Sequence, residues 1–402
     1  MSKTKSTKRR AFSPSRAVWR TQMDKGKYLP HRVSRISCIV NTFLSDRISE
    51  FLKELGTTAY IENSRTVREY IKSAPLAFMG KAIKLRDFPA VLFRFTVPGE
   101  NATEVMNCII DIAELHIPGR GTVFSQDLME FCEDSPAVDL DFLKSLKVAD
   151  HTDMLINKLA YVMCILPGQG SGENLAKVAL ELGVCVPVVT IGYGSDTRDK
   201  LGLVRVTIPP EKEIVHLVMP EQDSDSIAHL LIEQGRLNRP GSGFIVETPV
   251  TAGLLDTHLK TGKQEHAATI EQIIAAIDQL KSDTNWRKRL DAQSYRASSN
   301  RFIVPQDNCE ISIISDEDRI DKLKEVCMKH GAPGATSSFL TPQVPKGEEE
   351  ITATMIRVSI SVPSELTDTI TDALLEVSSI GEDKKDRIHI LDSPAAYIHT
   401  IQ

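Results

Sequence analysis

The chain has 402 residues and a formal net charge of −6, which is enough length for two or three domains with buried cores. No apolar stretch approaches the roughly 20 residues that a membrane-spanning helix needs. No secretory signal is visible at the start either. We therefore expect an ordinary globular protein without an integral membrane segment.

Seven cysteines are scattered singly along the chain and never form a Cys-x-x-Cys pair. An odd, dispersed set of this kind is typical of reduced thiols that pack as small apolar side chains. We therefore predict a cytoplasmic protein.

The first residues of the chain are strongly basic. Residues 1–35 contain eleven Lys or Arg against one acidic residue, Asp24. Segments of this composition are often solvated and flexible. The alternatives are an arm that touches nucleic acid or an acidic membrane surface, or one that docks on the acidic remainder of the chain. We expect no other contact with nucleic acid.

One pattern of apolar residues occurs three times along the chain. In each copy a strand-like run (residues 36–40, 161–166 and 311–314) precedes a helix with a single apolar stripe. A glycine follows each helix where a left-handed C-cap belongs, at Gly56, Gly183 and Gly331. The chain is therefore predicted to contain a tandem repeat.

The second half of each copy follows the same plan. A β-rich run ends on proline, at Pro98, Pro220 and Pro363, and a helical pattern follows it. Twenty residues beyond the first two prolines come the related turns 118–121 and 240–243, whereas the third copy has only 381–385 in that place. The common spacing indicates a common structure, with the turn altered in the third copy.

Each copy thus has the order strand, helix, strand, strand, helix, strand. Right-handed connections in that order give a four-stranded antiparallel sheet with both helices on one face, the ferredoxin-like arrangement. The other face of each sheet is too apolar for water, so three such faces should bury one another. We predict an α+β fold of three ferredoxin-like (βαββαβ) units arranged as an intramolecular pseudo-trimer, with clefts between neighbouring units.

The predicted division of the chain follows from this plan. The units span residues 36–128, 157–256 and 301–402, after a basic flexible tail over residues 1–35. Residues 129–156 form a linker. Residues 257–300 form a helical linker, because isoleucines recur on one face of a helix over 269–280.

The turns before the last strand of the first two copies are candidate phosphate sites. Glycine lacks the Cβ that would block a close approach, so successive backbone N–H groups can face an anion. The alternative is a tight turn without a ligand. The candidate binding residues are Gly119, Arg120 and Gly121 in the first copy, and Arg239, Gly241, Ser242 and Gly243 in the second.

No catalytic or metal constellation is recognisable in the sequence. The histidines do not pair at metal-ligand spacing, and no Ser-His-Asp or Cys-His arrangement is evident. His216 is predicted to be a packed strand residue, Glu211 and Glu213 a solvated strand end, and residues 167–172 a flexible turn. We therefore predict a protein that is not an enzyme, with no catalytic residues and no metal.

The middle copy resembles the P-II-type nitrogen-regulatory signalling proteins and their P-II-like relatives. The resemblance rests on residues 192–195 after the second strand, 209–215 entering the third and 235–246 entering the fourth, and it covers residues 158–250 well. The first and third copies match only in outline. Members of this family are homotrimers of ferredoxin-like subunits that bind adenine nucleotides between subunits and engage partner proteins through a flexible loop.

The resemblance implies a role for each matching residue. Gly192, Gly194 and Ser195 match the base of the flexible loop, and Arg239 with Gly241, Ser242 and Gly243 matches the glycine-rich phosphate loop. Two departures matter. The loop after Ser195 is short and lacks the tyrosine that typical members modify. Where typical members keep the lysine that holds 2-oxoglutarate, the nearest residue of this chain is Glu211, which would repel a dicarboxylate.

The resemblance implies a regulatory protein in signal transduction and nitrogen regulation. It would bind an adenine nucleotide (ATP, ADP or AMP) between its repeats and control a partner, either a membrane transporter or a metabolic enzyme. At most two of the three clefts would keep the phosphate chemistry. The alternatives are a ligand-free structural or adaptor protein on the same scaffold, and an enzyme acting on a phosphorylated substrate.

Overall fold

The computed structural model describes residues 30–69, 85–133, 135–181, 185–196, 211–237, 239, 241–256, 307–378, 380 and 386–398. Residues 1–29 of the basic stretch, residues 197–210, where a loop is predicted, and residues 257–300, where a helical linker is predicted, lie outside these ranges.

The first segment begins four residues before the end of the basic stretch. Its elements are β1 (His31–Asn41), α1 (Ser45–Leu55), β2 (Ala59–Glu69), β3 (Leu85–Pro98), α2 (Ala102–Ile112) and β4 (Gly121–Phe131), followed by the short helix α3 (Leu140–Ser145). Helix α1 buries one apolar stripe and ends at Gly56, whose φ of 78° is the left-handed cap that the sequence predicts. Arg35 lies inside β1 and is buried.

The other two segments repeat this order of elements. The second has β5 (Ile156–Pro167), α4 (Ser171–Glu181), β6 (Val188–Asp196), β7 (Glu211–Pro220), α5 (Glu221–Gln234) and β8 (Phe244–Leu254). The third has β9 (Asn308–Asp316), α8 (Glu317–Lys329), β10 (Gly334–Gln343), β11 (Met355–Pro363), α9 (Thr367–Val377), β12 (Arg387–Ser393) and β13 (Ala395–Ile398). Short 3-10 helices lie at Thr42–Leu44, Gly99–Asn101, Thr152–Met154 and Ser364–Leu366.

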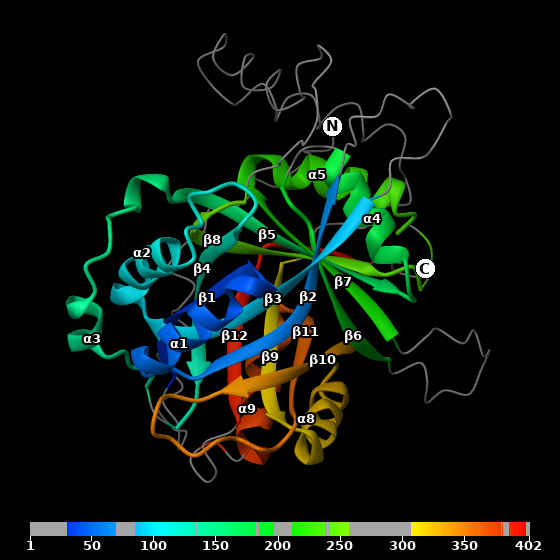
Figure 1. The fold of residues 1–402 in the computed structure, drawn as a ribbon. Helices are drawn as coiled ribbons and strands as arrows, with labels where there is room; N and C mark the ends of the chain where they lie inside the picture. The colour runs from blue at the N-terminus through cyan, green and yellow to red at the C-terminus, as the bar shows by residue number, and fades with distance from the viewer. Residues whose placement is uncertain are drawn as a thin grey trace, which may run out of the picture.

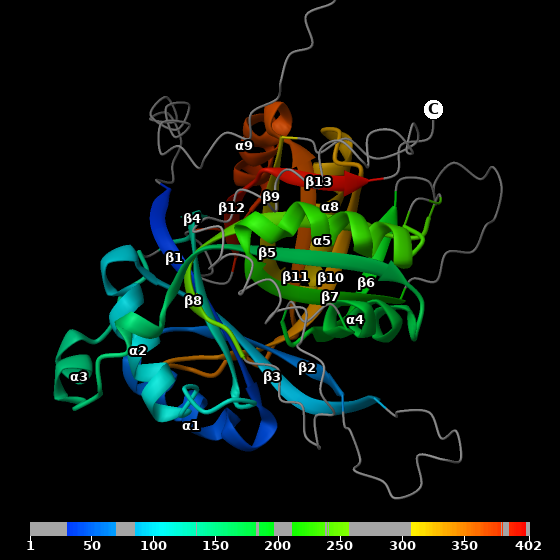
Figure 2. The same ribbon diagram turned by 90° about the horizontal axis from the view of Figure 1, so that it is seen from above.

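The strands form one continuous antiparallel sheet. Its thirteen strands follow the order β10-β11-β9-β12-β4-β1-β3-β2-β6-β7-β5-β8-β13. Additional pairings of β10 with β2 and β6, and of β4 with β8, connect distant parts of this order. The result is a closed ten-stranded antiparallel barrel with three further strands and a few short helices. The helices lie on the outside of the sheet (Figures 1 and 2).

The prediction of three ferredoxin-like units arranged as a pseudo-trimer is wrong. The strands of one segment pair with those of the next, as in β2 with β6, β12 with β4, and β13 with β8. These pairings give partners to edge N–H and C=O groups that separate sheets would leave open. The apolar core beside α4 and α5 also contains Val67 from β2 and Tyr397 from β13. Local periodicity predicts the helices and strands, but it does not determine which strand edges pair.

Alternation along the strands divides the core into an outer and an inner part. On β1, Ile36, Cys38 and Val40 belong to the apolar cluster beside α1 and α2. Arg35 and Ile39 point to the opposite face, as the two-residue period of a strand requires. Similar outer clusters lie beside α4 with α5, and α8 with α9. The inner face carries apolar residues together with many buried polar ones.

Two further findings bear on the sequence predictions. None of the seven cysteines forms a disulfide, and six of them are buried, as expected for thiols packed as apolar side chains. Across the ranges described above, no helix has both the length and the apolar character needed to cross a membrane.

Candidate functional site

The second glycine turn lies on the surface just before β8. Arg239 is exposed, and its carbonyl oxygen accepts hydrogen bonds from the backbone N–H of Ser242 (3.2 Å) and from the Ser242 hydroxyl (2.5 Å). Gly241 and Gly243 have φ angles of 76° and 117°, which L side chains rarely adopt. The turn therefore needs its glycines for backbone conformation, and it leaves the Arg239 side chain exposed to solvent.

The first glycine turn holds a carboxylate of the same chain. The backbone N–H of Gly119 donates to Oδ1 of Asp256 at 2.8 Å, and the backbone N–H of Asp256 donates to the Thr122 hydroxyl at 2.9 Å. Arg120 pairs with Glu114 at 2.8 Å. An internal carboxylate thus takes the place that a phosphate oxygen would take, and the nearby arginine already has a counter-ion.

The start of α4 holds a carboxylate in the same way. The buried backbone N–H of Gly172 donates to Oε2 of Glu213 at 2.6 Å, where the helix dipole favours negative charge. Glu213 also pairs with Arg65 of β2 at 2.7 Å. Glu213 is 4% exposed, so the prediction that it lies at a solvated strand end is wrong.

The predicted loop-base residues lie in a strand. Gly192, Gly194 and Ser195 belong to β6, and Gly194 and Ser195 pair with Thr336 and Ala335 of β10. In the sheet, β7 and β5 separate β6 from β8, the strand that follows the second glycine turn. The structure therefore does not bring these residues together in the sheet with Gly241 and Gly243.

A polar network that was not among the predicted sites fills part of the barrel interior. Glu62 of β2 is 3% exposed and accepts hydrogen bonds from Arg94 of β3 and from Arg357 of β11. Two N–H groups of Arg357 reach the two oxygens of this carboxylate, at 2.6 and 3.2 Å. Burial opposes the charge of Arg94, but Glu62 and Tyr161 outweigh it and raise the pKa of this guanidinium. One carboxylate thus pairs with arginines from the first and third segments.

A chain of hydrogen bonds continues from Arg94 into the second segment. Arg94 donates to the Tyr161 oxygen (3.1 Å), which lies 2.5 Å from Nδ1 of His216, and Nε2 of His216 lies 2.7 Å from the Thr190 hydroxyl. Burial and the nearby arginines hold the pKa of His216 well below its ordinary value. Because arginine can only donate, the Tyr161 oxygen accepts from Arg94 and the Tyr161 hydroxyl donates its hydrogen bond to Nδ1 of His216. Neutral His216 then donates from Nε2 to the Thr190 hydroxyl. His216 is therefore the packed strand residue that the sequence predicts.

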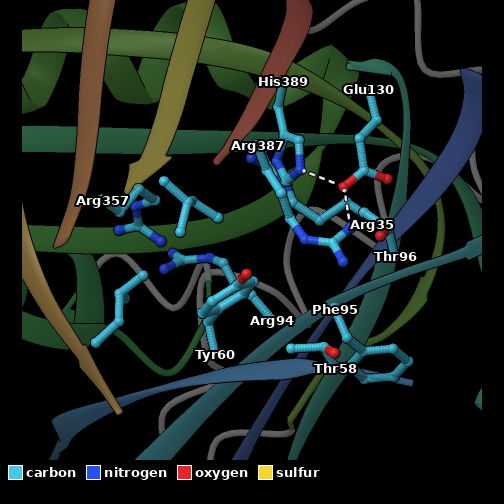
Figure 3. Close-up of a pocket in the computed structure, with 12 residues that line it drawn as sticks. Arg35, Thr58, Tyr60, Arg94, Phe95, Thr96, Glu130, Arg357, Arg387 and His389 are labelled. Carbon is cyan, nitrogen blue, oxygen red and sulfur yellow. Dashed lines mark hydrogen bonds and ion pairs between the residues drawn. The ribbon is translucent and has the colours of Figure 1, made fainter. Parts of the chain in front are cut away.

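A second carboxylate connects β4 to the third segment. Oε1 of Glu130 accepts from Arg387 at 2.8 Å and contacts Nε2 of His389 at 3.0 Å (Figure 3). Burial alone would raise the pKa of Glu130, but the hydrogen bonds and charges of His389 and Arg387 lower it to about 2.

The depressed pKa of Glu130 predicts a loss of stability in acid. Because the folded value lies below the ordinary 4.5, this carboxylate stabilises the fold above about pH 4.5, and the contribution disappears as the pH falls towards 2. A shift of that size corresponds to about 3 kcal/mol. The free energy of unfolding, measured with denaturant between pH 2 and 6, should therefore decrease as the pH falls. The slope of this free energy against pH should be flatter for Glu130→Gln than for the native chain. Equal slopes would contradict the assignment, and Glu54→Gln, an exposed carboxylate, should keep the native slope.

A small cavity lies within this network. It is lined by twelve residues that include Arg35, Arg94, Arg357, Arg387 and Glu130 (Figure 3). The space that the centre of a water molecule can occupy inside it is about 10 Å³. That volume holds about one water molecule. The cavity is therefore too small for a nucleotide.

The sequence contained a signal for this network. Arg94 and His216 stand in apolar runs, each four residues before the closing proline of its run. A charged or titratable residue inside an apolar strand is buried at a cost unless it has partners. Arg35 gives no such signal, because it follows directly on the basic stretch and is indistinguishable from it by charge.

Across the described ranges, no group of three or more His, Cys, Asp and Glu side chains could hold a metal ion. Comparison of the sequence with protein-family models and with curated proteins gave no match. The resemblance to the P-II family therefore rests on the residues quoted for it above.

Proposed function

We propose that this protein is a non-enzymatic, P-II-like regulatory protein of the cytoplasm that binds an adenine nucleotide and controls a partner protein. The observation that carries the proposal is the second glycine turn. Its Gly241 and Gly243 keep the backbone free of Cβ atoms on a left-handed path, and the exposed Arg239 offers a fork of donors that fits phosphate. The turn precedes β8 at the point where Phe244 pairs with Ile398 of β13, so it lies where two segments meet.

Only the second turn is proposed as a nucleotide site. At the first turn Asp256 holds the Gly119 N–H, and Arg120 is paired with Glu114. A phosphate entering there would have to displace one carboxylate and would be repelled by it. This gives one nucleotide per chain.

The proposed partner is a transporter or a metabolic enzyme that contacts the surface near β6. Ile191 and Tyr193 of β6 and Phe339 of β10 are exposed, and the rings of Tyr193 and Phe339 pack edge to face with centroids 5.4 Å apart. Exposed apolar side chains that lie together often mark contacts between proteins. Ile191 and Tyr193 precede the segment that corresponds to the partner-binding loop of the P-II family.

Replacing Arg239 with alanine is expected to weaken nucleotide binding at least about tenfold, because a hydrogen bond to a charged group contributes about 1.5–3 kcal/mol. Calorimetry with ATP, ADP and AMP on the purified chain measures this directly. Arg120→Ala is the matched control, since it alters the corresponding arginine of the first turn, and it should leave the affinity unchanged.

The same experiment separates the alternative function. The internal carboxylates at Gly119 and Gly172 favour a ligand-free adaptor, because two sites suited to anions are satisfied within the chain. Absence of binding by any of the three nucleotides at millimolar concentration would reject the sensor proposal and leave the adaptor. Equal losses in Arg239→Ala and Arg120→Ala would place the nucleotide elsewhere.

A further inference from the structure

The cavity inside the barrel is surrounded by an excess of positive charge. Its wall contains four guanidinium groups, from Arg35, Arg94, Arg357 and Arg387, and a single carboxylate, Glu130. The carboxylates of Glu62 and Glu310 pair with these arginines but are not part of the cavity wall. The four guanidinium groups thus face three carboxylates in all, and the one unbalanced positive charge favours an anion in the space that they enclose.

Two N–H groups of this wall lack an acceptor among the described residues. They are Nε of Arg35 and Nε of Arg387, both buried. The Arg35 side chain is only 5% exposed, and its Nη2 is used by Gln126 at 2.9 Å. A buried donor without an acceptor is unfavourable, and charged donors more so. A guest that accepts from these groups would remove that cost.

The carboxylate in the wall is only partly held within the chain. Oε1 of Glu130 is held by Arg387 and His389, whereas Oε2, also buried, has no hydrogen-bond partner among the described residues and points away from both (Figure 3). Phe95, Ile314 and Leu340 complete the wall with apolar surface, which strengthens the attraction between charges by excluding water.

Size decides the kind of anion. About 10 Å³ is open to the centre of a water-sized guest, which suits a single atom and not a tetrahedral phosphate. We propose that the barrel interior binds one halide ion, chloride in ordinary solution, as a buried counter-ion to the one unbalanced positive charge of this arginine cluster. This site is separate from the second glycine turn and does not depend on nucleotide binding.

Crystals of the full chain grown in sodium bromide test the proposal directly. Data collected at the bromine absorption edge should give an anomalous peak inside the barrel, within hydrogen-bonding distance of Arg35 Nε or Arg387 Nε. A cavity that holds water alone would overturn the proposal, and so would peaks confined to the molecular surface, which would be adventitious ions only.

Thermal unfolding gives a second measurement in solution. At equal ionic strength, the native chain should unfold at a higher temperature in sodium chloride or bromide than in sodium gluconate, because ligands that bind the folded state stabilise it. Arg35→Gln should lose this difference, and Arg47→Gln, at an exposed arginine, should keep it. Equal midpoints of the native chain in all three salts would overturn the proposal. If Arg35→Gln does not fold, the bromide crystals still decide.

Discussion

Replacing Glu62 with glutamine is expected to lower the free energy of unfolding by about 3–5 kcal/mol, because it leaves buried cations without their counter-ion. Glu62 is 3% exposed and holds both Arg94 and Arg357. The substitution keeps the shape of the side chain, so packing contributes little to the loss. Urea or guanidinium unfolding at neutral pH, fitted with a common m-value, measures the effect.

An exposed carboxylate provides the matched control for Glu62. Glu54 pairs with Lys346 at the surface, where ion pairs contribute little because water screens them. Glu54→Gln should therefore leave the unfolding midpoint almost unchanged. A loss below about 1 kcal/mol for Glu62→Gln, the range of an exposed pair, would mean that the two arginines find other partners when this carboxylate is removed.

Replacing Gly243 with alanine is expected to destabilise the fold by about 3–5 kcal/mol, combining backbone strain with overpacking. The φ of Gly243 is 117°, and a Cβ there would overlap the carbonyl oxygen of Ile165 in the neighbouring strand. Because β8 pairs with β5 from Phe244 onwards, the clash falls where the two strands come together. Thermal or chemical unfolding of the variant gives the measurement.

Gly56→Ala separates the two causes of this effect. Gly56 also has a positive φ, 78°, but a Cβ there would meet nothing within 4 Å, so only the conformational cost of about 1–2 kcal/mol remains. Equal losses in the two variants would show that the contact with Ile165 is unimportant. Neither result tests nucleotide binding, because packing requires Gly243 whether or not a phosphate binds. Arg239→Ala is the variant that tests binding.

Buried charges connect the first segment of the barrel to the third. Glu62 comes from β2 and Arg357 from β11, while Glu130 of β4 pairs with Arg387 of β12. These contacts specify partners, since an unpaired charge in the interior is far more costly than an unpaired apolar group. Apolar surface alone would tolerate several arrangements of the same strands.

Part of the candidate site could be predicted from the sequence. The glycines at 241 and 243 were identified by turn chemistry, and the structure gives both the positive φ that glycine permits. The partner of Gly119 could not be predicted, because Asp256 is 137 residues away along the chain. The same holds for Glu62 and Arg357, which are separated by 295 residues.

The sequence by itself determined the elements: the apolar stripe of α1, the cap at Gly56 and the prolines that end β3, β7 and β11, because each depends on residues within a few positions of one another. Only the tertiary structure decided that the strands join into one closed barrel and that its interior is charged. Strand edges carry backbone groups that are the same for every residue type, so their pairing depends on the whole arrangement rather than on local pattern.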